Sequence, residues 1–210
     1  MAKEHDRYLR EHTTPEDSVL EELDRKTHLY AVNPNMLSGH LLGRLLEMMS
    51  YMVSPSQILE IGTYTGYSAI CLARGLKSGG QLHTIEVNDE LREMSTHYIA
   101  LAGVADRVTL HTGRAQDIIP SMPYTFDLVF IDGDKREYSE YYDLVFDKVR
   151  NGGFIIADNV LWGGKIVDGE ASVDPQTKGV ILFNEKVRND RRVEKVMLPV
   201  RDGILIARKK

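Results

Sequence analysis

The sequence predicts an α/β protein in which a mostly parallel sheet is covered by helices on both faces. From about residue 57 onward, short apolar segments alternate with segments of helical periodicity, an order typical of parallel sheets. Several apolar segments, such as 128–131 and 154–157, are continuous rather than alternating, which indicates strands buried on both faces. The last two apolar segments are joined by a tight connection containing Asp202-Gly203, so we expect a hairpin and an antiparallel last strand.

Residues 1 to about 55 are predicted to form helices that cap the same domain. Thr14 is a possible N-cap, Pro15 would take the first helical position, and acidic residues follow in the first turn. A second helix has apolar residues at helical spacing, and its methionines are expected to fill the core; these positions are Leu41, Leu42, Leu45, Leu46, Met48 and Met49. No repeat, low-complexity segment or linker divides the sequence, so we expect one domain over residues 1–210.

The remaining elements follow in regular order. We predict strands at 57–62, 80–87, 106–113, 126–132, 152–158, 191–200 and 202–210. We predict helices at 66–76, 88–104, 115–122, 135–149 and about 178–188, with a loop at about 160–176. Asn88 is the predicted N-cap of the second of these helices, because its side chain can accept a hydrogen bond from the first turn.

The composition limits the classes of function. The chain has 210 residues, of which 42% are hydrophobic and 27% charged, and its net charge is -5, which argues against a nucleic-acid partner bound through bulk charge. The single cysteine, Cys71, excludes an internal disulfide framework and is predicted to be a small buried apolar residue. The polar N-terminus lacks a signal-peptide pattern, and no apolar run approaches the roughly 18 residues of a membrane span. We therefore expect a soluble cytoplasmic chain without a membrane partner.

The turn after the first predicted strand, in LEIGTYTGYS, is the first candidate binding element. Gly62 and Gly66 bracket this turn, and ligands of open parallel sheets bind at the carboxyl ends of the strands. The glycines alone are equally well explained by the geometry of a strand-to-helix turn. The dinucleotide pattern G-x-G-x-x-G is absent, and Glu60 precedes the turn. An acid at this position is unfavourable for a pyrophosphate and favourable for a cationic ligand.

Glu86 ends the second predicted strand, 24 residues after Gly62. A carboxylate at this position can accept both hydroxyls of a ribose, although it could also be a solvated acid at a strand end. Together with Glu60, it indicates a nucleoside with a positive, phosphate-free tail. S-adenosylmethionine fits this description better than NAD does.

Two further predicted strands end in oxygen donors. Asp132 ends one strand, Asp158 ends the next, and Asn159 follows directly. Acids at strand ends often cap loops or helices, and Asp134 is a candidate cap for the helix that begins near Lys135. The two ends together favour a site for Mg²⁺, although Mn²⁺ and Ca²⁺ use similar ligands.

Lys135 lies three residues past the first of these acids. Most lysines are solvated, but a divalent cation nearby would favour the neutral amine. In that setting Lys135 is a candidate general base that takes a proton from a hydroxyl bound to the metal.

Five motifs together resemble the cation-dependent class I O-methyltransferases, the catechol and caffeoyl-CoA type enzymes that use S-adenosylmethionine. They are ILEIGTYTGYSAICLA, HTIEVNDEL, GRAQDIIP, FDLVFIDGDKREY and GGFIIADNVLWGGKIVD, and the resemblance extends from about Met36 to Lys210. It implies a Rossmann-like sheet of seven strands whose last strand is antiparallel. It also implies that Asp132, Asp158 and Asn159 hold the cation, that Lys135 is the catalytic base, and that the protein is a homodimer.

The resemblance also implies a cofactor site. In that site Gly62, Tyr64 and Ser68 line the methionine end of the cofactor, and Glu60, just before the turn, and Gly66, at its end, are also assigned to cofactor binding. Glu86 binds the ribose, and Ala115 and Gln116 contact the adenine. Asp132 contacts the amino group, and Met36 and Leu37 close over the ligands. Animal catechol enzymes carry His-Trp where this chain has Gly133-Asp134, so the likeness is greater to the caffeoyl-CoA and bacterial branch. Trp162 is then a loop anchor or a pocket wall.

The sequence leaves competing functions open. The favoured function is methylation of one hydroxyl of a vicinal dihydroxy aromatic, and the acceptor could be a catechol, a caffeoyl thioester or a flavonoid. The alternative is a metal-dependent hydrolase on a doubly wound sheet, with Asp132 or Asp134 as the nucleophile. A non-catalytic binding protein and a NAD-dependent oxidoreductase fit the motifs less well.

Overall fold

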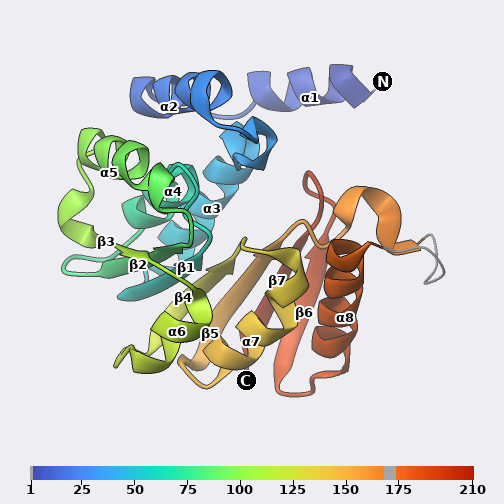
Figure 1. Ribbon diagram of the computed structural model, residues 1–210. Coiled ribbons are helices and arrows are strands. Elements are labelled where there is room, and N and C mark those ends of the chain that lie inside the picture. Colours follow the sequence, from blue (N-terminus) through green and yellow to red (C-terminus); the bar gives the residue numbers. More distant parts are fainter. Residues whose placement is uncertain (1, 168–173) are drawn as a thin grey trace.

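A seven-stranded sheet with the strand order β3-β2-β1-β4-β5-β7-β6 forms the centre of the computed structural model, which describes residues 2–167 and 174–210 (Figure 1). The strands are β1 Gln57–Ile61, β2 Gln81–Glu86, β3 Val108–Thr112, β4 Phe126–Ile131, β5 Val149–Asp158, β6 Val193–Leu198 and β7 Ile204–Lys209. The first five strands are parallel, and β7 pairs antiparallel with both β5 and β6. The predicted fold class, including the antiparallel last strand, is confirmed. The strand order reverses between β1 and β4, which is where such sheets bind ligands.

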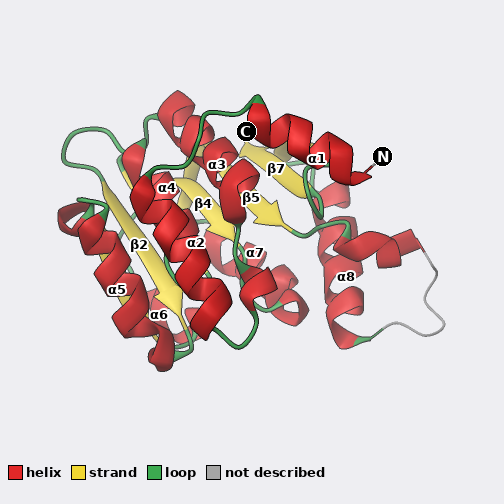
Figure 2. Cartoon of the chain, turned by 90° about the horizontal axis from the view of Figure 1, so that it is seen from above, coloured by secondary structure: helices red, strands yellow, loops and turns green. Residues whose placement is uncertain are grey.

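Helices cover both faces of this sheet (Figure 2). The helices of the described residues are α1 Ala2–Glu11, α2 Ser18–Tyr30, α3 Gly39–Val53, α4 Tyr67–Arg74, α5 Arg92–Leu101, α6 Ala115–Ile118, α7 Tyr138–Phe146 and α8 Pro175–Asn189. Of these, α1 and α2 lie over other helices rather than directly on the sheet. Short 3₁₀ segments connect them, namely η1 Pro34–Met36, η2 Asp89–Leu91, η3 Ala105–Arg107, η4 Ile119–Ser121, η5 Lys135–Glu137 and η6 Trp162–Val167. None of the helices in the described ranges combines the length and apolar composition needed to cross a membrane.

Strand β4 shows why its sequence is continuously apolar. Val129 and Ile131 pack into the core formed with α6, α7 and α8, whereas Leu128 and Phe130 pack into the core formed with α2 to α5. Side chains alternate between the two faces of a strand, so a strand covered on both sides needs apolar residues at every position. All four residues are fully buried.

The start of α2 differs from the prediction. The helix begins at Ser18, and Asp17 is its N-cap, because Oδ1 of Asp17 accepts hydrogen bonds from the backbone amides of Val19 and Leu20. The prediction that Thr14 caps this helix and Pro15 begins it is therefore wrong. An aspartate three residues later offers a better acceptor for the free amides of the first turn.

Two other predicted caps are confirmed. The side chain of Asn88 accepts from the amide of Glu90, and the side chain of Asp134 accepts from the amide of Arg136. Asp134 therefore has a structural role at the start of η5, as the sequence indicated. This arrangement fixes the direction of the chain as it leaves β4.

The apolar pattern of α3 is only partly a core pattern. Met49 is buried as predicted, but Met48 is 54% exposed and does not fill the core. Leu42 and Leu46 are buried, whereas Leu41 and Leu45 are half-buried. Consecutive helical positions point about 100° apart, so a wide apolar stripe always leaves some members at the rim. Cys71, on α4, is buried as predicted.

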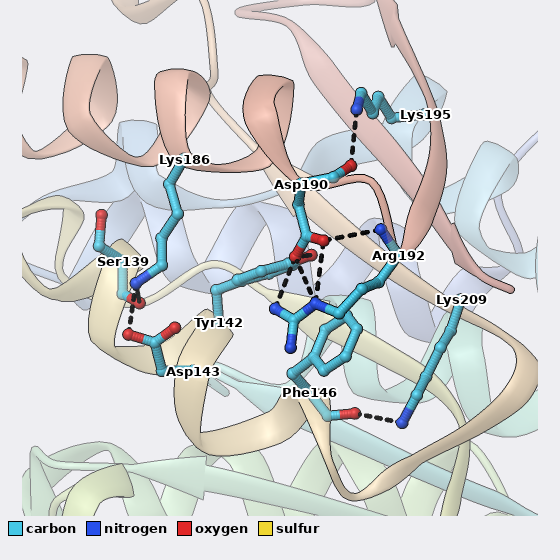
Figure 3. Close-up of polar contacts among 9 residues, drawn as sticks. All are labelled: Ser139, Tyr142, Asp143, Phe146, Lys186, Asp190, Arg192, Lys195 and Lys209. Atoms are coloured by element: carbon cyan, nitrogen blue, oxygen red, sulfur yellow. Dashed lines mark hydrogen bonds and ion pairs between the residues drawn. The ribbon is translucent and has the colours of Figure 1, made fainter.

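The end of α8 is held to α7 through Asp190 (Figure 3). Its carboxylate accepts from Tyr142 Oη at 3.0 Å and from Arg192 Nε at 3.0 Å. The Arg192 guanidinium also lies 3.7 Å from the centre of the Phe146 ring, and the neighbouring Arg192 lowers the pKa of Asp190 to about 2. These contacts fix α8 against α7, and α8 in turn packs against η5.

Candidate active site

A cavity of about 880 Å³ opens at the carboxyl ends of the central strands. Its lining includes Gly62 directly after β1, Glu86 at the end of β2, Asp132 directly after β4 and Asp158 at the end of β5. This is the edge where the strand order reverses, as the fold predicts for a ligand site.

Most of the predicted site residues line this one cavity. They are Met36, Gly62, Tyr64, Ser68, Glu86, Ala115, Gln116, Asp132, Lys135, Asp158 and Asn159, together with Leu37 and Trp162. Glu60 and Gly66, which were also predicted to bind the cofactor, are not among its lining residues. The first turn therefore divides into residues that face the cavity and residues that support it.

Gly62 occupies a position that only glycine fits. Its φ is +101°, and a Cβ atom there would lie 2.3 Å from the carbonyl oxygen of Asp132. The chain is held in this place because the Gly62 amide donates to Ile85 O at 2.9 Å and the Asp132 amide donates to Ile61 O at 2.8 Å. The backbone of the first turn thus lies directly against the end of β4, which brings the two candidate binding regions together.

Glu60 lies beneath the cavity and is fully buried. Its Oε2 accepts from Thr84 Oγ1 at 2.5 Å, and its Oε1 has no hydrogen-bond partner among the described residues. Burial raises the pKa of Glu60 to about 8, and the negative charges of Asp132 and Glu86 act in the same direction. Gly66, with φ +96°, serves as the N-cap position of α4.

The Glu86 carboxylate is oriented by backbone amides. Oε2 accepts from Tyr64 N at 2.7 Å, and Oε1 accepts from Asn88 N at 2.9 Å. Each carboxylate oxygen has capacity for further hydrogen bonds, and Glu86 lines the cavity. The arrangement suits a ligand that presents neighbouring hydroxyl groups.

The start of α6 contributes a second polar contact point. Nε2 of Gln116 donates to Glu140 Oε2 at 3.1 Å, which leaves Oε1 of Gln116 without a partner in the described part of the chain. Ala115, beside it, is buried and lines the cavity. A buried amide oxygen that borders a cavity is an acceptor for a ligand N–H group.

Asp132 and Asp158 lie at equivalent places on neighbouring strands. In the parallel pairing of β4 with β5, Ile131 is opposite Ala157, so the two aspartates are the next residues on each strand. Burial raises the pKa of Asp158 to about 7, and the nearby charge of Asp132 adds to this effect. Asn159 follows with φ +57°, and its amide donates to Asp158 Oδ1 at 2.8 Å.

Lys135 is buried beside these acids. Its Nζ donates to Asp132 Oδ1 at 2.7 Å and to Tyr138 Oη at 2.6 Å. Tyr138 Oη in turn donates to the carbonyl oxygen of Asp158 at 3.1 Å. Gly179 of α8 allows close packing here, because a Cβ atom on it would lie 2.3 Å from Lys135 O. An amine, two carboxylates and an amide thus border one cavity.

The donor set fits a hard divalent cation better than a softer one that prefers nitrogen or sulfur ligands. Nowhere in residues 2–167 and 174–210 do three His, Cys, Asp or Glu side chains converge as metal ligands, so a site here would depend on the amide oxygen of Asn159 in addition to two carboxylates. Oxygen donors of this kind suit Mg²⁺, Mn²⁺ or Ca²⁺. The pKa of Asp158 is raised by burial and, to a smaller degree, by the negative charge of Asp132, and a bound cation would favour the ionised carboxylate.

The fold and cavity define a class of protein. The structure is similar to the O-methyltransferase TomG from Streptomyces achromogenes in complex with S-adenosylmethionine, with a TM-score of 0.91 and 31% identity over 99% of this chain and 96% of that chain. It is also similar to the O-methyltransferase from Bacillus cereus in complex with S-adenosylhomocysteine, with a TM-score of 0.90 and 33% identity over 98% of this chain and 96% of that chain. The fold is that of the methyltransferases that use S-adenosylmethionine.

The sequence comparisons name the family. A profile of the O-methyltransferase family matches residues 10–210, so the chain belongs to this family. It is 34% identical to a catechol O-methyltransferase of Niastella koreensis over 172 residues, which are 80% of this chain and 75% of that protein. It is 33% identical to tricin synthase 2 of Oryza sativa over 178 residues, and the alignment spans 80% of this chain but only 61% of that protein.

Several cavity residues escaped the sequence prediction. Arg201, Asp202 and Tyr141 line the cavity, yet Arg201 and Asp202 lie in the β6–β7 turn, far along the chain from the other site residues. Asp202-Gly203 was recognised only as a turn signal. Nothing in the local sequence indicates that this turn reaches the cavity, since its position depends on how β7 pairs with β5.

Proposed function

We propose that the protein transfers a methyl group from S-adenosylmethionine to one hydroxyl of a vicinal dihydroxy aromatic held by a divalent cation. The observation that carries the proposal is the joint position of Lys135, Asp132 and Asp158 at the ends of two neighbouring strands, beside the glycine turn. The names of two relatives, a catechol O-methyltransferase and a caffeoyl-CoA O-methyltransferase of Arabidopsis thaliana, support the acceptor class.

The cofactor would lie along the β1 and β2 side of the cavity. Glu86 would accept the ribose hydroxyls, since backbone amides already orient its carboxylate. The backbone at Gly62 and Tyr64, with the Ser68 side chain, would contact the methionine end, and Ala115 and Gln116 would contact the adenine. Glu60, which is buried and accepts a hydrogen bond from Thr84, would support the glycine turn from outside the cavity lining.

Asp132, Asp158 and Asn159 would hold the cation, most simply Mg²⁺. When bound, the cation would supply Lewis acidity that holds both oxygens of the diol and favours loss of a proton. The two carboxylates are positioned for this by strand pairing rather than by a flexible loop. A site on rigid elements keeps its ligands in place without ordering at the moment of binding.

Lys135 would act as the general base. Its amine takes the proton from the hydroxyl to be methylated, and the oxygen then attacks the methyl carbon of the sulfonium. The carbon–sulfur bond breaks with its electron pair going to sulfur, which leaves S-adenosylhomocysteine and the methyl ether. Alignment of the two reactants in one cavity could contribute up to roughly 7–11 kcal/mol to the lowering of the barrier.

A labelled-methyl assay tests the proposal. A panel of ortho-dihydroxy aromatics, each with its monohydroxy counterpart, is incubated with labelled S-adenosylmethionine and Mg²⁺ or with a chelator. We expect transfer to diols only, and only with the cation present. Transfer that persists in EDTA, or a parent protein that binds S-adenosylhomocysteine but methylates no diol, would refute it.

The resemblance to the family also leads us to propose a homodimer of single-domain subunits that acts in the cytoplasm. Exposed apolar side chains on α3 and β6, among them Tyr51, Met52 and Val196, are available for such an interface. Sedimentation equilibrium tests the assembly, and a mass equal to a single chain over the working concentration range would exclude it.

A further inference from the structure

The residues between α2 and α3 form one wall of the cavity. We call residues 33–38, which include η1, the covering segment; all six line the cavity. Its first residue is held at one side of the cavity, where Tyr64 Oη donates to Asn33 O at 3.0 Å. Its end is held from the other side, where Arg201 Nη2 donates to Leu37 O at 3.1 Å and Arg201 Nη1 donates to Ser38 O.

The turn that carries Arg201 is itself fixed. Gly203 N donates to Val200 O at 2.9 Å and closes the turn, and Leu161 N donates to Asp202 O at 2.8 Å. The turn is therefore bonded to the chain that follows β5, directly after Asp158 and Asn159. An arginine on this fixed turn can hold the covering segment at a defined distance from the end of β5.

Arg201 adopts a backbone conformation that is unfavourable for its residue type. Among the described residues, five that are not glycine have positive φ, and Ser54 is the one that does not line the cavity; the others are Tyr64, Asn159, Trp162 and Arg201. Left-handed backbone angles are disfavoured for side chains with a Cβ atom, and such strain concentrates at functional sites. Glycine would fit the turn at Arg201 without that cost, so the arginine side chain has another role.

We propose that Arg201 is a positioning residue that latches the covering segment over the acceptor end of the cavity. The inference rests on the proposed function, which assigns the β1–β2 side of the cavity to the cofactor and the β4–β5 side to the cation and acceptor. Tyr64 holds the segment on the cofactor side and Arg201 holds it on the acceptor side. Loss of Arg201 therefore opens the acceptor end while the cofactor end stays held.

The two hydrogen bonds from Arg201 to the covering segment should contribute enough binding free energy for their loss to be measured. Hydrogen bonds from a charged donor contribute more than neutral ones, and Arg201 makes two to backbone carbonyls of the segment. Removal of both is expected to raise the acceptor KM about tenfold or more. The dissociation constant of S-adenosylhomocysteine is expected to change by less than about twofold, since none of its proposed contacts involves Arg201.

Three variants test the latch. Arg201→Gly removes the contacts and also relieves the backbone strain, and Arg201→Lys retains the charge and the strain but cannot bridge two carbonyls in the same plane. Ser54→Gly is the matched control, because Ser54 has φ +47° at the end of α3 and lies outside the cavity lining. Hydrogen–deuterium exchange of peptides that cover residues 33–38 reports the latch directly and needs no acceptor.

Arg201→Gly is expected to exchange faster over residues 33–38 and to show the raised acceptor KM with kcat within about threefold. Arg201→Lys should fall between it and the parent, and Ser54→Gly should match the parent in exchange and KM. Unchanged exchange over residues 33–38 in Arg201→Gly, or an acceptor KM equal to that of the parent, would overturn the latch. If no diol is methylated by the parent, the proposed function fails, and the exchange rates still decide whether Arg201 holds the segment.

Discussion

Nζ of Lys135 lies 2.7 Å from Oδ1 of Asp132, and both residues come from the six residues that link β4 to α7. The same amine contacts Tyr138 Oη, which is bonded to the backbone of Asp158. One short turn therefore holds the amine in a fixed relation to the ends of two strands. The buried position of Lys135, with only 7% of its surface exposed, keeps it from the fully solvated state that is usual for lysine.

The first prediction concerns Lys135 itself. Lys135→Ala should lower turnover by roughly 10²- to 10⁴-fold, since it removes the general base. Binding of S-adenosylhomocysteine should stay within about threefold of the parent, because the amine has no proposed contact with the cofactor. Steady-state kinetics and calorimetry check both parts, with the exposed Lys77→Ala as control. Turnover that survives in Lys135→Ala would remove this residue from the mechanism.

A second prediction separates cofactor binding from chemistry. Glu86→Ala should weaken S-adenosylhomocysteine binding by roughly 10- to 100-fold, because it removes charged hydrogen bonds to the ribose. At saturating cofactor, kcat should remain near that of the parent. Glu90→Ala, an exposed acid four residues on that does not line the cavity, is the control. Equal affinities of the two variants for the cofactor product would contradict the ribose assignment.

The third prediction tests the close contact between the backbone at Gly62 and the end of β4. Gly62→Ala should destabilise the protein by more than Gly79→Ala. Both glycines have positive φ, but a Cβ atom at Gly79 meets nothing within 4 Å, whereas one at Gly62 lies 2.3 Å from Asp132 O. The strain of positive φ alone costs about 1 kcal/mol, so Gly79→Ala measures that part by itself. Chemical denaturation gives the unfolding free energy of each variant. Equal decreases in the two variants would show that the contact between Gly62 and Asp132 O adds no cost beyond that of positive φ.

The fourth prediction concerns the pH dependence of stability. Glu60 has its pKa raised from an ordinary 4.5 to about 8 by burial. Between these values the folded protein retains a proton that the unfolded chain releases. The contribution of Glu60 to stability is therefore full below about pH 4.5 and is lost as pH rises toward about 8, at up to roughly 1.4 kcal/mol per pH unit. Above about pH 8 no further change follows.

Glu60→Gln removes this titration while keeping the shape of the side chain. The difference in unfolding free energy, variant minus parent, should rise with pH from about 5 to 8 and then level off. Denaturation curves at a series of pH values measure it, with the exposed Glu93→Gln as control. Parallel curves for parent and Glu60→Gln would mean that the carboxyl is not protonated in the folded state.

The positions of strands and helices depend mainly on residues that are close in the sequence, and most of them could be predicted from it. The strand at 126–132 was predicted from its apolar run and is observed as Phe126–Ile131, and the parallel topology then brought Asp132 and Asp158 to the same edge. The helix predicted at about 178–188 begins earlier, at Pro175, because Asp174 is its N-cap. That signal, an aspartate followed by proline, was present in the sequence. The predicted loop at 160–176 contains η6, and its residues 168–173 lie outside the described residues.

Features set by distant contacts could not be predicted. The burial of Glu60 is one such feature: side chains alternate along a strand, and Glu60 shares the face of Ile58 that packs toward α3 and α4, so it does not line the cavity. The role of Arg201 depends on contacts across more than 160 residues of sequence, since it bonds to Leu37 at a separation of 164. No local pattern carries that information.

Binding of Mn²⁺ to the S-adenosylhomocysteine complex, followed by electron paramagnetic resonance, tests the cation site most directly. Asp158→Asn retains the shape of the side chain and removes one of the two carboxylates proposed as ligands, and Asp147→Asn changes an exposed acid on the far end of α7 as control. We expect one tightly bound Mn²⁺ per chain in the parent and in Asp147→Asn, and loss of this ion in Asp158→Asn. Equally tight binding in Asp158→Asn, or no bound Mn²⁺ in the parent, would contradict it.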